Sequence, residues 1–430
     1  MNNSEKFSNR FINLIFLLSY ITILTGFFYG EDSLGGAKGD YIYHLNIANS
    51  FNLNFIETWT GFGFGEDGLQ TRNSPVFWVI ISVINKFLSH DLIRLINTSV
   101  SLVICIFFFK CLCLKFKKID KKILATIACS VIFLSPTIRS LSIWPYSLIW
   151  GLFLFIISIY NYLLFNEKRI IKNKVINSFF CIFYLAIASY LYPSFAVFSV
   201  YYVFYFFRFF GFTKNFIIIV LANFIVALPA LYFVLTKGLY FFHATGITLS
   251  NSVSFNFASK IIIISSLILY FLIPILDFKE VYIDIKKKIR IKETFYLVLI
   301  TLILTNFFSY PYFEGGGFGG GFFHKISNIT LNNNLILFLC FYIFVNIYIS
   351  LFKNNLNNHL IFLTLILFNL QFTIYNKYFD PLLLILIFLI FDFNIDKHLF
   401  KNKIQITKFI SILFIYLLMG LFKNKFYLFL

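Results

Sequence analysis

Apolar and polar positions form long blocks along this chain, and the apolar blocks recur from its beginning to its end. A helix needs about 20 consecutive apolar residues to cross the hydrocarbon core of a bilayer. Thirteen runs approach this length, several of them short: 11–29, 95–114, 123–141, 147–165, 175–192, 194–210, 216–236, 261–277, 294–310, 335–352, 359–375, 381–394 and 406–422. The pattern predicts an all-α protein, a polytopic transmembrane helical bundle that forms a single integral membrane domain over residues 1–430.

Composition agrees with a membrane protein and leaves no room for a large soluble domain. Of the 430 residues, 60% are hydrophobic and 13% are charged, whereas soluble domains carry about 25% charged residues. The net charge of +18 suits nucleic acid only if the cations gather on one soluble face. In a membrane protein the placement of cations reports orientation instead, so we expect no nucleic-acid partner.

The connections between the apolar runs alternate in charge. One set of alternate connections carries 23 of the 36 lysines and arginines, and the opposite set carries 11. Short loops rich in Lys and Arg stay on the cytoplasmic side. The N-terminus is therefore predicted to be cytoplasmic and the C-terminus to lie outside. Short basic cytoplasmic loops also suit contact with the anionic lipids of the bilayer.

The apolar stretch 75–90 is the main ambiguity in this assignment. Were it a span, the basic connection 115–122 would move outside and every later loop would invert. We interpret it instead as a helix lying in the outer interface. The first outer loop then covers residues 30–94, followed by outer connections at 142–146, 237–260, 311–334 and 376–380.

Loop 30–94 is acidic and aromatic, and it carries the candidate catalytic region. It contains Gly39-Asp40-Tyr41-Ile42-Tyr43-His44 and, some thirty residues later, Arg72-Asn73-Ser74-Pro75-Val76-Phe77-Trp78. If residues 40–50 are helical, Asp40 and His44 share one face, one turn apart. A carboxylate there can act as a general base toward a sugar hydroxyl. The alternative is that Asp40 only caps an interfacial helix.

These two stretches resemble the first outer loop of the GT-C superfamily of membrane glycosyltransferases. The pattern Asp40-x-x-Tyr43-x-x-x-Ile47-Ala48 and the later Arg72-to-Trp78 segment are similar to the branch of the lipid A aminoarabinose transferases and protein mannosyltransferases. Two features differ from the family pattern: Ser74-Pro75 replaces Pro-Pro, and the second outer loop has no carboxylate.

The resemblance implies a glycosyltransferase that acts on the extracytoplasmic side, in the bacterial inner membrane. The donor would be a polyprenyl-phosphate sugar, and the acceptor a lipid-linked molecule or a protein of the cell envelope. Asp40 would be the catalytic base of an inverting transfer, with Tyr43, His44 and Arg72 as substrate-binding residues. No cofactor or metal is expected.

Two further outer segments are candidates for binding the donor. The stretch Tyr375-Asn376-Lys377-Tyr378-Phe379-Asp380-Pro381 is similar to the Arg-Tyr followed by Pro found late in many GT-C proteins. Lys377 would bind the donor phosphate and Tyr378 would hydrogen-bond it. The alternative is an ordinary anchor, because Tyr and Lys are common at span ends.

The glycine-rich outer loop 311–334 contains Glu314-Gly315-Gly316-Gly317-Phe318-Gly319-Gly320-Gly321-Phe322-Phe323-His324-Lys325. It lacks the Gly-Lys-Ser/Thr ending of a phosphate-binding P-loop. A flap over a lipid-linked substrate is one interpretation, with His324 or Lys325 meeting the phosphate. A merely flexible loop is the other.

Two other function classes remain open at this point. A flippase or transporter for lipid-linked glycans would show internal repeats and ionisable residues inside its spans. We find no clear repeat, and few such residues. A polysaccharide polymerase would hold its substrates on two arginine-bearing outer loops. The only outer arginines here are Arg72, Arg94 and Arg139, so this class ranks below the glycosyltransferase.

Overall fold

The structure is a computed structural model, and it describes residues 3–62, 74–168, 170–236, 254–288, 291–312, 319–352 and 355–426. The chain divides into two compact units, Met1–Thr245 with Leu413–Leu430, and Gly246–Ile412. Every regular element in the described ranges is a helix, apart from one isolated bridge between Gly319 and Ile374. The prediction of an all-α protein is confirmed.

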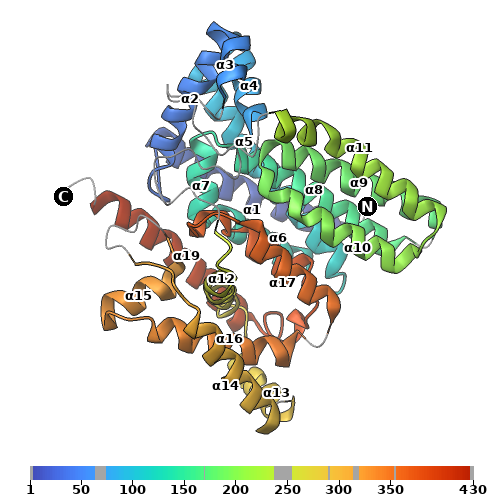
Figure 1. The fold of residues 1–430 in the computed structure, drawn as a ribbon, viewed down its shortest axis with the longest axis vertical. Coiled ribbons are helices and arrows are strands. Elements are labelled where there is room, and N and C mark those ends of the chain that lie inside the picture. The colour runs from blue at the N-terminus through green and yellow to red at the C-terminus, as the bar shows by residue number, and fades with distance from the viewer. Residues whose placement is uncertain are drawn as a thin grey trace. The chain divides into compact units, whose positions relative to one another are not determined.

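The first unit contains most of the long helices. In chain order they are α1 (Asn3–Phe28), α2 (Ala37–Leu53), α3 (Phe55–Gly61), α4 (Pro75–Ile84), α5 (His90–Lys115), α6 (Lys121–Phe133), α7 (Pro136–Ile143), α8 (Ser147–Glu167), α9 (Ile171–Leu191), η1 (Pro193–Val197), α10 (Phe198–Phe210) and α11 (Lys214–Thr236), closed by the end of α19 (Lys403–Phe426). Helices α8 to α11 lie side by side (Figure 1).

A sharp bend separates α6 from α7, whose axes differ by 64°. Pro136 at the start of α7 cannot donate a backbone hydrogen bond, and a proline disfavours helical geometry in the residue before it. The Ser135 hydroxyl accepts from the Ile138 amide at 3.1 Å and so caps the new helix. All eight residues of α7 are buried, so this short helix lies inside the first unit.

The second unit is built from shorter helices. They are α12 (Phe257–Leu272), α13 (Phe278–Lys288), α14 (Ile291–Asn306), α15 (Gly321–Leu331), α16 (Leu335–Leu351), α17 (Leu356–Phe368), η3 (Asn376–Tyr378), α18 (Leu382–Leu389), η4 (Ile395–Lys397) and the start of α19. All eight residues of α18 are buried. That helix has apolar side chains on every side, as expected for a helix buried in a protein core.

Seven helices of the described chain are long and apolar enough to cross a membrane, or eight if α6 and α7 form one bent span. They correspond to eight of the thirteen predicted spans. The other five predicted spans coincide with shorter helices. A helix rises about 1.5 Å per residue, so the eight residues of α18 cover only about 12 Å, and α17 ends at Phe368 rather than at residue 375. The chain is a helical protein with several candidate spans, and the count of thirteen stays a prediction.

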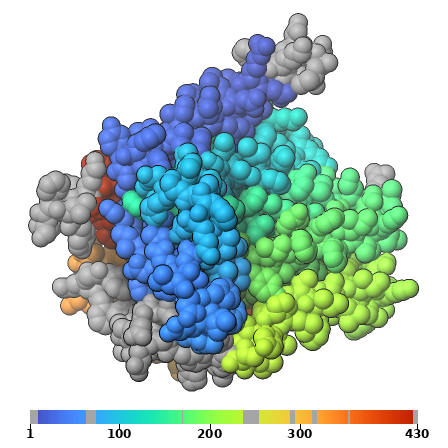
Figure 2. All heavy atoms as spheres, turned by 90° about the horizontal axis from the view of Figure 1, so that it is seen from above, coloured from blue at the N-terminus to red at the C-terminus, as the bar shows by residue number. Residues whose placement is uncertain are grey.

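The connection between α1 and α5 folds into a compact group of three short helices, α2, α3 and α4 (Figure 1). Helix α4 has ten residues and covers about 15 Å, half of the hydrocarbon thickness. Its buried side packs Phe77, Trp78 and Ile81 against Ile47 and Phe51 of α2. Figure 2 shows the blue surface of this group beside the green and lime surface of α9 to α11. We call these three helices the first-loop group.

Candidate functional site

Asp40 lies in the first turn of α2 but does not cap it. The residue before the helix is Gly36, with φ of 90°, and no side chain caps from that position. The carboxylate of Asp32 accepts from the backbone amides of Gly35 at 3.0 Å and Lys38 at 3.2 Å. The alternative that Asp40 is the helix cap is therefore wrong, because the cap position is Gly36 and the Lys38 amide of the first turn donates to Asp32. An acidic residue in the first turn is stabilised by the helix dipole, and Asp40 is half-buried.

The buried face of α2 explains how the predicted residues are presented. Tyr41, His44 and Ile47 are buried, while Asp40 is half-buried and Tyr43 is exposed. Tyr43 is 39% exposed. The His44 ring stacks on the Trp78 indole, with centroids 4.4 Å apart and planes 7° apart. His44 thus anchors α2 on α4, whereas Asp40 is half-buried and Tyr43 is exposed.

Tyr41, the residue after Asp40, belongs to a second cluster, which also contains His90, Arg94 and Trp144. The Tyr41 hydroxyl is 3.2 Å from Nδ1 of His90, and burial raises the pKa of Tyr41 to about 12, so the hydroxyl stays protonated. The Arg94 guanidinium lies 4.1 Å from the centre of the Trp144 ring and pairs with Asp91 at 3.2 Å. Tyr41 directly follows Asp40 in the chain, so this cluster places the Arg94 cation and the His90 ring near the first turn of α2.

A buried ion pair lies in this region, and the sequence analysis did not detect it. Arg139 on α7 donates through Nε and Nη2 to the two carboxylate oxygens of Glu31, at 2.7 and 2.5 Å. The two side chains are 7% and 9% exposed. Arg139 also donates to the backbone oxygen of Thr22 at 2.9 Å. The available signal was an arginine three residues after Pro136, within the apolar run 123–141.

The pair is one of several side-chain contacts that hold the segment before α2. We call these contacts, made by Arg139, Ser140 and Asn424, the clamp. The Ser140 hydroxyl accepts from the Leu34 amide at 2.8 Å, and Ser33 donates to the Pro136 carbonyl at 3.1 Å. From the end of α19, the Asn424 side-chain amide donates to the carbonyls of Asp32 and Ser33 at 3.0 and 2.8 Å. Segment 31–36 is therefore fixed by side chains from α7 and α19.

In the second unit, the glycines just before α15 contact Ile374, which lies two residues before η3. The Gly320 amide donates to the Ile374 carbonyl at 2.9 Å. Gly319 has φ of 84°, and a Cβ there would lie 2.3 Å from the same carbonyl oxygen, so only glycine fits this close approach. The Tyr310 hydroxyl accepts from the Ile374 amide at 3.0 Å. These contacts bring the helix that carries His324 and Lys325 to the segment that leads to Lys377 and Tyr378.

His324 is buried at 1% exposure among Phe308, Tyr310 and Tyr312. Burial lowers the pKa of His324 to about 4, so its ring is neutral near neutral pH and carries no charge toward a phosphate. Lys325 beside it is half-buried.

Lys377 and Tyr378 form the turn η3. The Lys377 ammonium lies 5.6 and 5.9 Å from the ring centres of Tyr375 and Tyr378, and Tyr378 is buried. The sequence analysis missed Lys260, whose buried ammonium donates to the Asn369 carbonyl at 2.9 Å. A lysine directly before the apolar run 261–277 was its only signal.

The predicted site residues therefore fall into two sets. Asp40, Tyr43 and His44 come together on α2 in the first unit, and His324, Lys325, Lys377 and Tyr378 belong to neighbouring segments of the second. Arg72 and residues 314–318 lie outside the described residues. Within the described ranges, no group of three or more His, Cys, Asp or Glu side chains could hold a metal ion. Comparison with protein-family models, with curated proteins and with solved structures found no significant match.

Proposed function

We propose that this chain is a GT-C-like membrane glycosyltransferase that moves a sugar from a polyprenyl-phosphate donor to a cell-envelope acceptor on the extracytoplasmic side. One observation carries the proposal. In the described residues of the connection after α1, helices α2 to α4 pack on one another, and Asp40 lies half-buried in the first turn of α2, on the same helix as the buried rings of Tyr41 and His44.

The reaction is a single displacement. The Asp40 carboxylate accepts the proton of an acceptor hydroxyl, and the hydroxyl oxygen attacks the anomeric carbon from the face opposite the phosphate. The bond between that carbon and the phosphate oxygen breaks, the phosphate leaves as the anion, and the sugar is inverted. Cations stabilise the departing charge. Arg72, from the same connection as Asp40, is the proposed source, and Lys325 and Lys377 stay the residues predicted from sequence to bind the donor phosphate.

The remaining predicted residues have different roles in this proposal. Tyr43 is exposed one turn from Asp40 and contacts the substrate. His44 acts as a positioning residue, because its ring is packed on Trp78. The clamp from Arg139 and Ser140 holds the entrance to α2, and such preorganisation is what a general base needs for an aligned proton transfer.

The proposal also assigns an orientation. We propose a bacterial inner-membrane protein with a cytoplasmic N-terminus and about thirteen membrane-crossing segments, which leaves the first-loop group outside. Acceptors on that side are lipid-linked glycans, lipid A or proteins.

Transfer of label from a set of polyprenyl-phosphate sugars to membrane acceptors tests the function. Asp40→Asn should lower turnover by about 10²–10⁴, the usual contribution of a general base, at unchanged protein level. The matched control is Glu57→Gln, an exposed acid of the same first-loop group, which should stay active. A folded, fully active Asp40→Asn protein would remove the assignment of the base. A lipid-linked sugar that crosses the bilayer without forming a new bond would indicate a flippase, and lengthened glycan chains would indicate a polymerase.

A further inference from the structure

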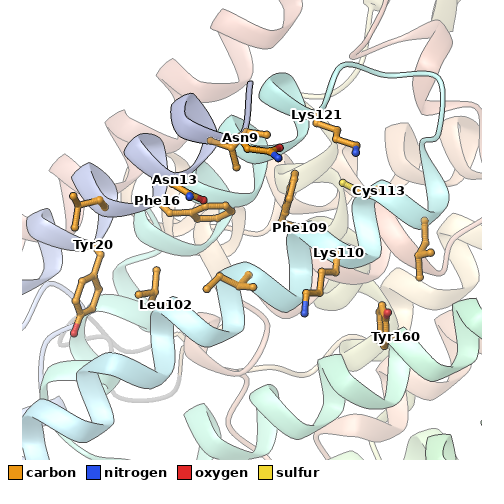
Figure 3. A pocket seen from close by; sticks show the side chains of 14 residues that line it. Asn9, Asn13, Phe16, Tyr20, Leu102, Phe109, Lys110, Cys113, Lys121 and Tyr160 are labelled. Carbon is orange, nitrogen blue, oxygen red and sulfur yellow. The ribbon is translucent and has the colours of Figure 1, made fainter. Parts of the chain in front are cut away.

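An open pocket of about 690 Å³ lies at the opposite end of α5 from the first-loop group. It is lined by α1, α5 and the starts or faces of α6 and α8, all within the first unit. Figure 3 shows Lys110, Lys121 and Tyr160 toward one end of it, and Tyr20 and Leu102 toward the other. Its volume falls in the range of small-molecule sites, about 300–1,000 Å³.

The two ends of the pocket differ in chemistry. Asn9 of α1 lies toward Lys121 and adds a side-chain amide there, and Asn13 adds another beside Phe16. The rest of the lining is aliphatic and aromatic, with Leu17 and Ile106 among its members. A polar end joined to an apolar trough matches an amphiphile, a headgroup followed by an acyl chain.

The charge of the polar end is entirely positive. The 14 lining residues include Lys110 and Lys121 and no acidic residue. No ion pair of Lys110 occurs in the described parts of the chain, and its ammonium lies 4.9 Å from the Phe107 ring. A lysine within a membrane-crossing helix is costly and marks a functional position by default. Lys110 is five residues from the end of α5, about 7.5 Å, within reach of the headgroup region for a snorkelling side chain.

We propose that this pocket binds one anionic phospholipid from the leaflet on the side of the basic connection 115–122. Lys110 and Lys121 hold the phosphodiester, the asparagines hydrogen-bond the headgroup, and one acyl chain lies along α1 and α5. A zwitterionic lipid fits less well, because its cationic group would meet the two ammonium groups without a carboxylate to offset them. The proposal is independent of the glycosyltransferase activity.

The test is a lipid titration of the purified full-length protein in detergent, with phosphatidylglycerol and phosphatidylcholine as probes, read by native mass spectrometry. Phosphatidylglycerol should bind more tightly than phosphatidylcholine. Lys110→Gln and Lys121→Gln should each weaken its binding about fivefold, since each basic residue near an anionic surface contributes about that factor. Leu17→Trp should weaken binding of both lipids by filling the trough.

The matched control is Lys118→Gln, an exposed lysine of the same connection that does not line the pocket; it should change nothing. Cys113 gives a second reading, because it lines the pocket and is the one half-exposed cysteine of six. Its alkylation by N-ethylmaleimide should slow when phosphatidylglycerol is added. Equal affinity for the two lipids, equal losses in Lys118→Gln and Lys110→Gln, or protection of Cys113 by inorganic phosphate alone would each overturn the proposal.

Discussion

At the scale of single residues, the Glu31–Arg139 pair has the clearest energetic consequence. Both charges are withdrawn from water, and such a pair is stable only while each partner satisfies the other. Gly26 belongs to the same arrangement, since a Cβ at that position would lie 2.3 Å from a Glu31 carboxylate oxygen. The pair fixes the start of the connection that carries Asp40.

Replacing Arg139 with Met should destabilise the protein by about 3–5 kcal/mol, because the Glu31 carboxylate stays buried without its partner. Thermal unfolding in detergent measures the loss. The double variant Glu31→Leu/Arg139→Met serves as the control and should recover most of it, since no buried charge remains. A single variant as stable as the wild-type protein would show that the pair is not buried in the membrane-embedded molecule.

Asp40 could be predicted from the sequence, whereas the pairing of Glu31 with Arg139 could not. Asp40 was identified from its spacing to Tyr43 and from the resemblance to the GT-C loop, and its position in a helix follows from local pattern. The partnership of Glu31 with Arg139 joins residues 108 positions apart. Each partner looks like an ordinary loop charge by itself, so no local pattern could predict their contact.

At the scale of elements, the first-loop group depends on the contact between α2 and α4. The Trp78 ring is fully buried and carries the stacked ring of His44 on one face, with Phe77 packed edge-on at 4.7 Å. Ile80, on the opposite side of α4, is 44% exposed. The two positions therefore allow a comparison within one helix.

Trp78→Ala should cost about 3–5 kcal/mol, the usual loss for removing a buried large aromatic side chain, and should lower transfer activity by releasing α2. Ile80→Ala should leave both nearly unchanged. Thermal unfolding and the transfer assay, run on both variants in parallel, measure the two effects. A Trp78→Ala protein with wild-type stability and activity would mean that α4 does not support α2.

Helix existence was easier to predict than helix length. The long apolar runs at 11–29, 95–114 and 147–165 form long helices, as predicted. The runs at 359–375 and 381–394 form shorter ones, since hydrophobicity alone does not separate a segment that crosses lipid from one buried in protein. Every residue of α18 is buried in the protein, so this helix is as apolar as a span.

At the scale of the whole molecule, the proposed function requires one orientation. The count of cations favours a cytoplasmic N-terminus, which leaves α2 to α4 outside and the connection 115–122 inside. A helix of ten residues at 75–84 agrees with this assignment, because a full span there would invert every later connection.

Labelling of introduced cysteines in intact cells tests the orientation, since the five cysteines other than Cys113 are buried. In a background with Cys113 replaced by Ser, a membrane-impermeant maleimide should label Glu57→Cys from outside, and Lys118→Cys only after the cells are opened. Both positions are exposed, so access to the reagent depends on the side of the membrane. The reverse pattern would place Asp40 in the cytoplasm and withdraw the proposed reaction.

The clamp on segment 31–36 has a consequence for how the protein is made. Glu31 leaves the ribosome 108 residues before Arg139, an interval of roughly 5–20 seconds at ordinary synthesis rates. Asn424 follows Asp32 after 392 residues. During synthesis the segment that leads to Asp40 waits for α7, and α19 completes its fixation. Nascent chains that stop before α7 should leave this segment open to protease, and those that stop between α7 and α19 should protect it in part.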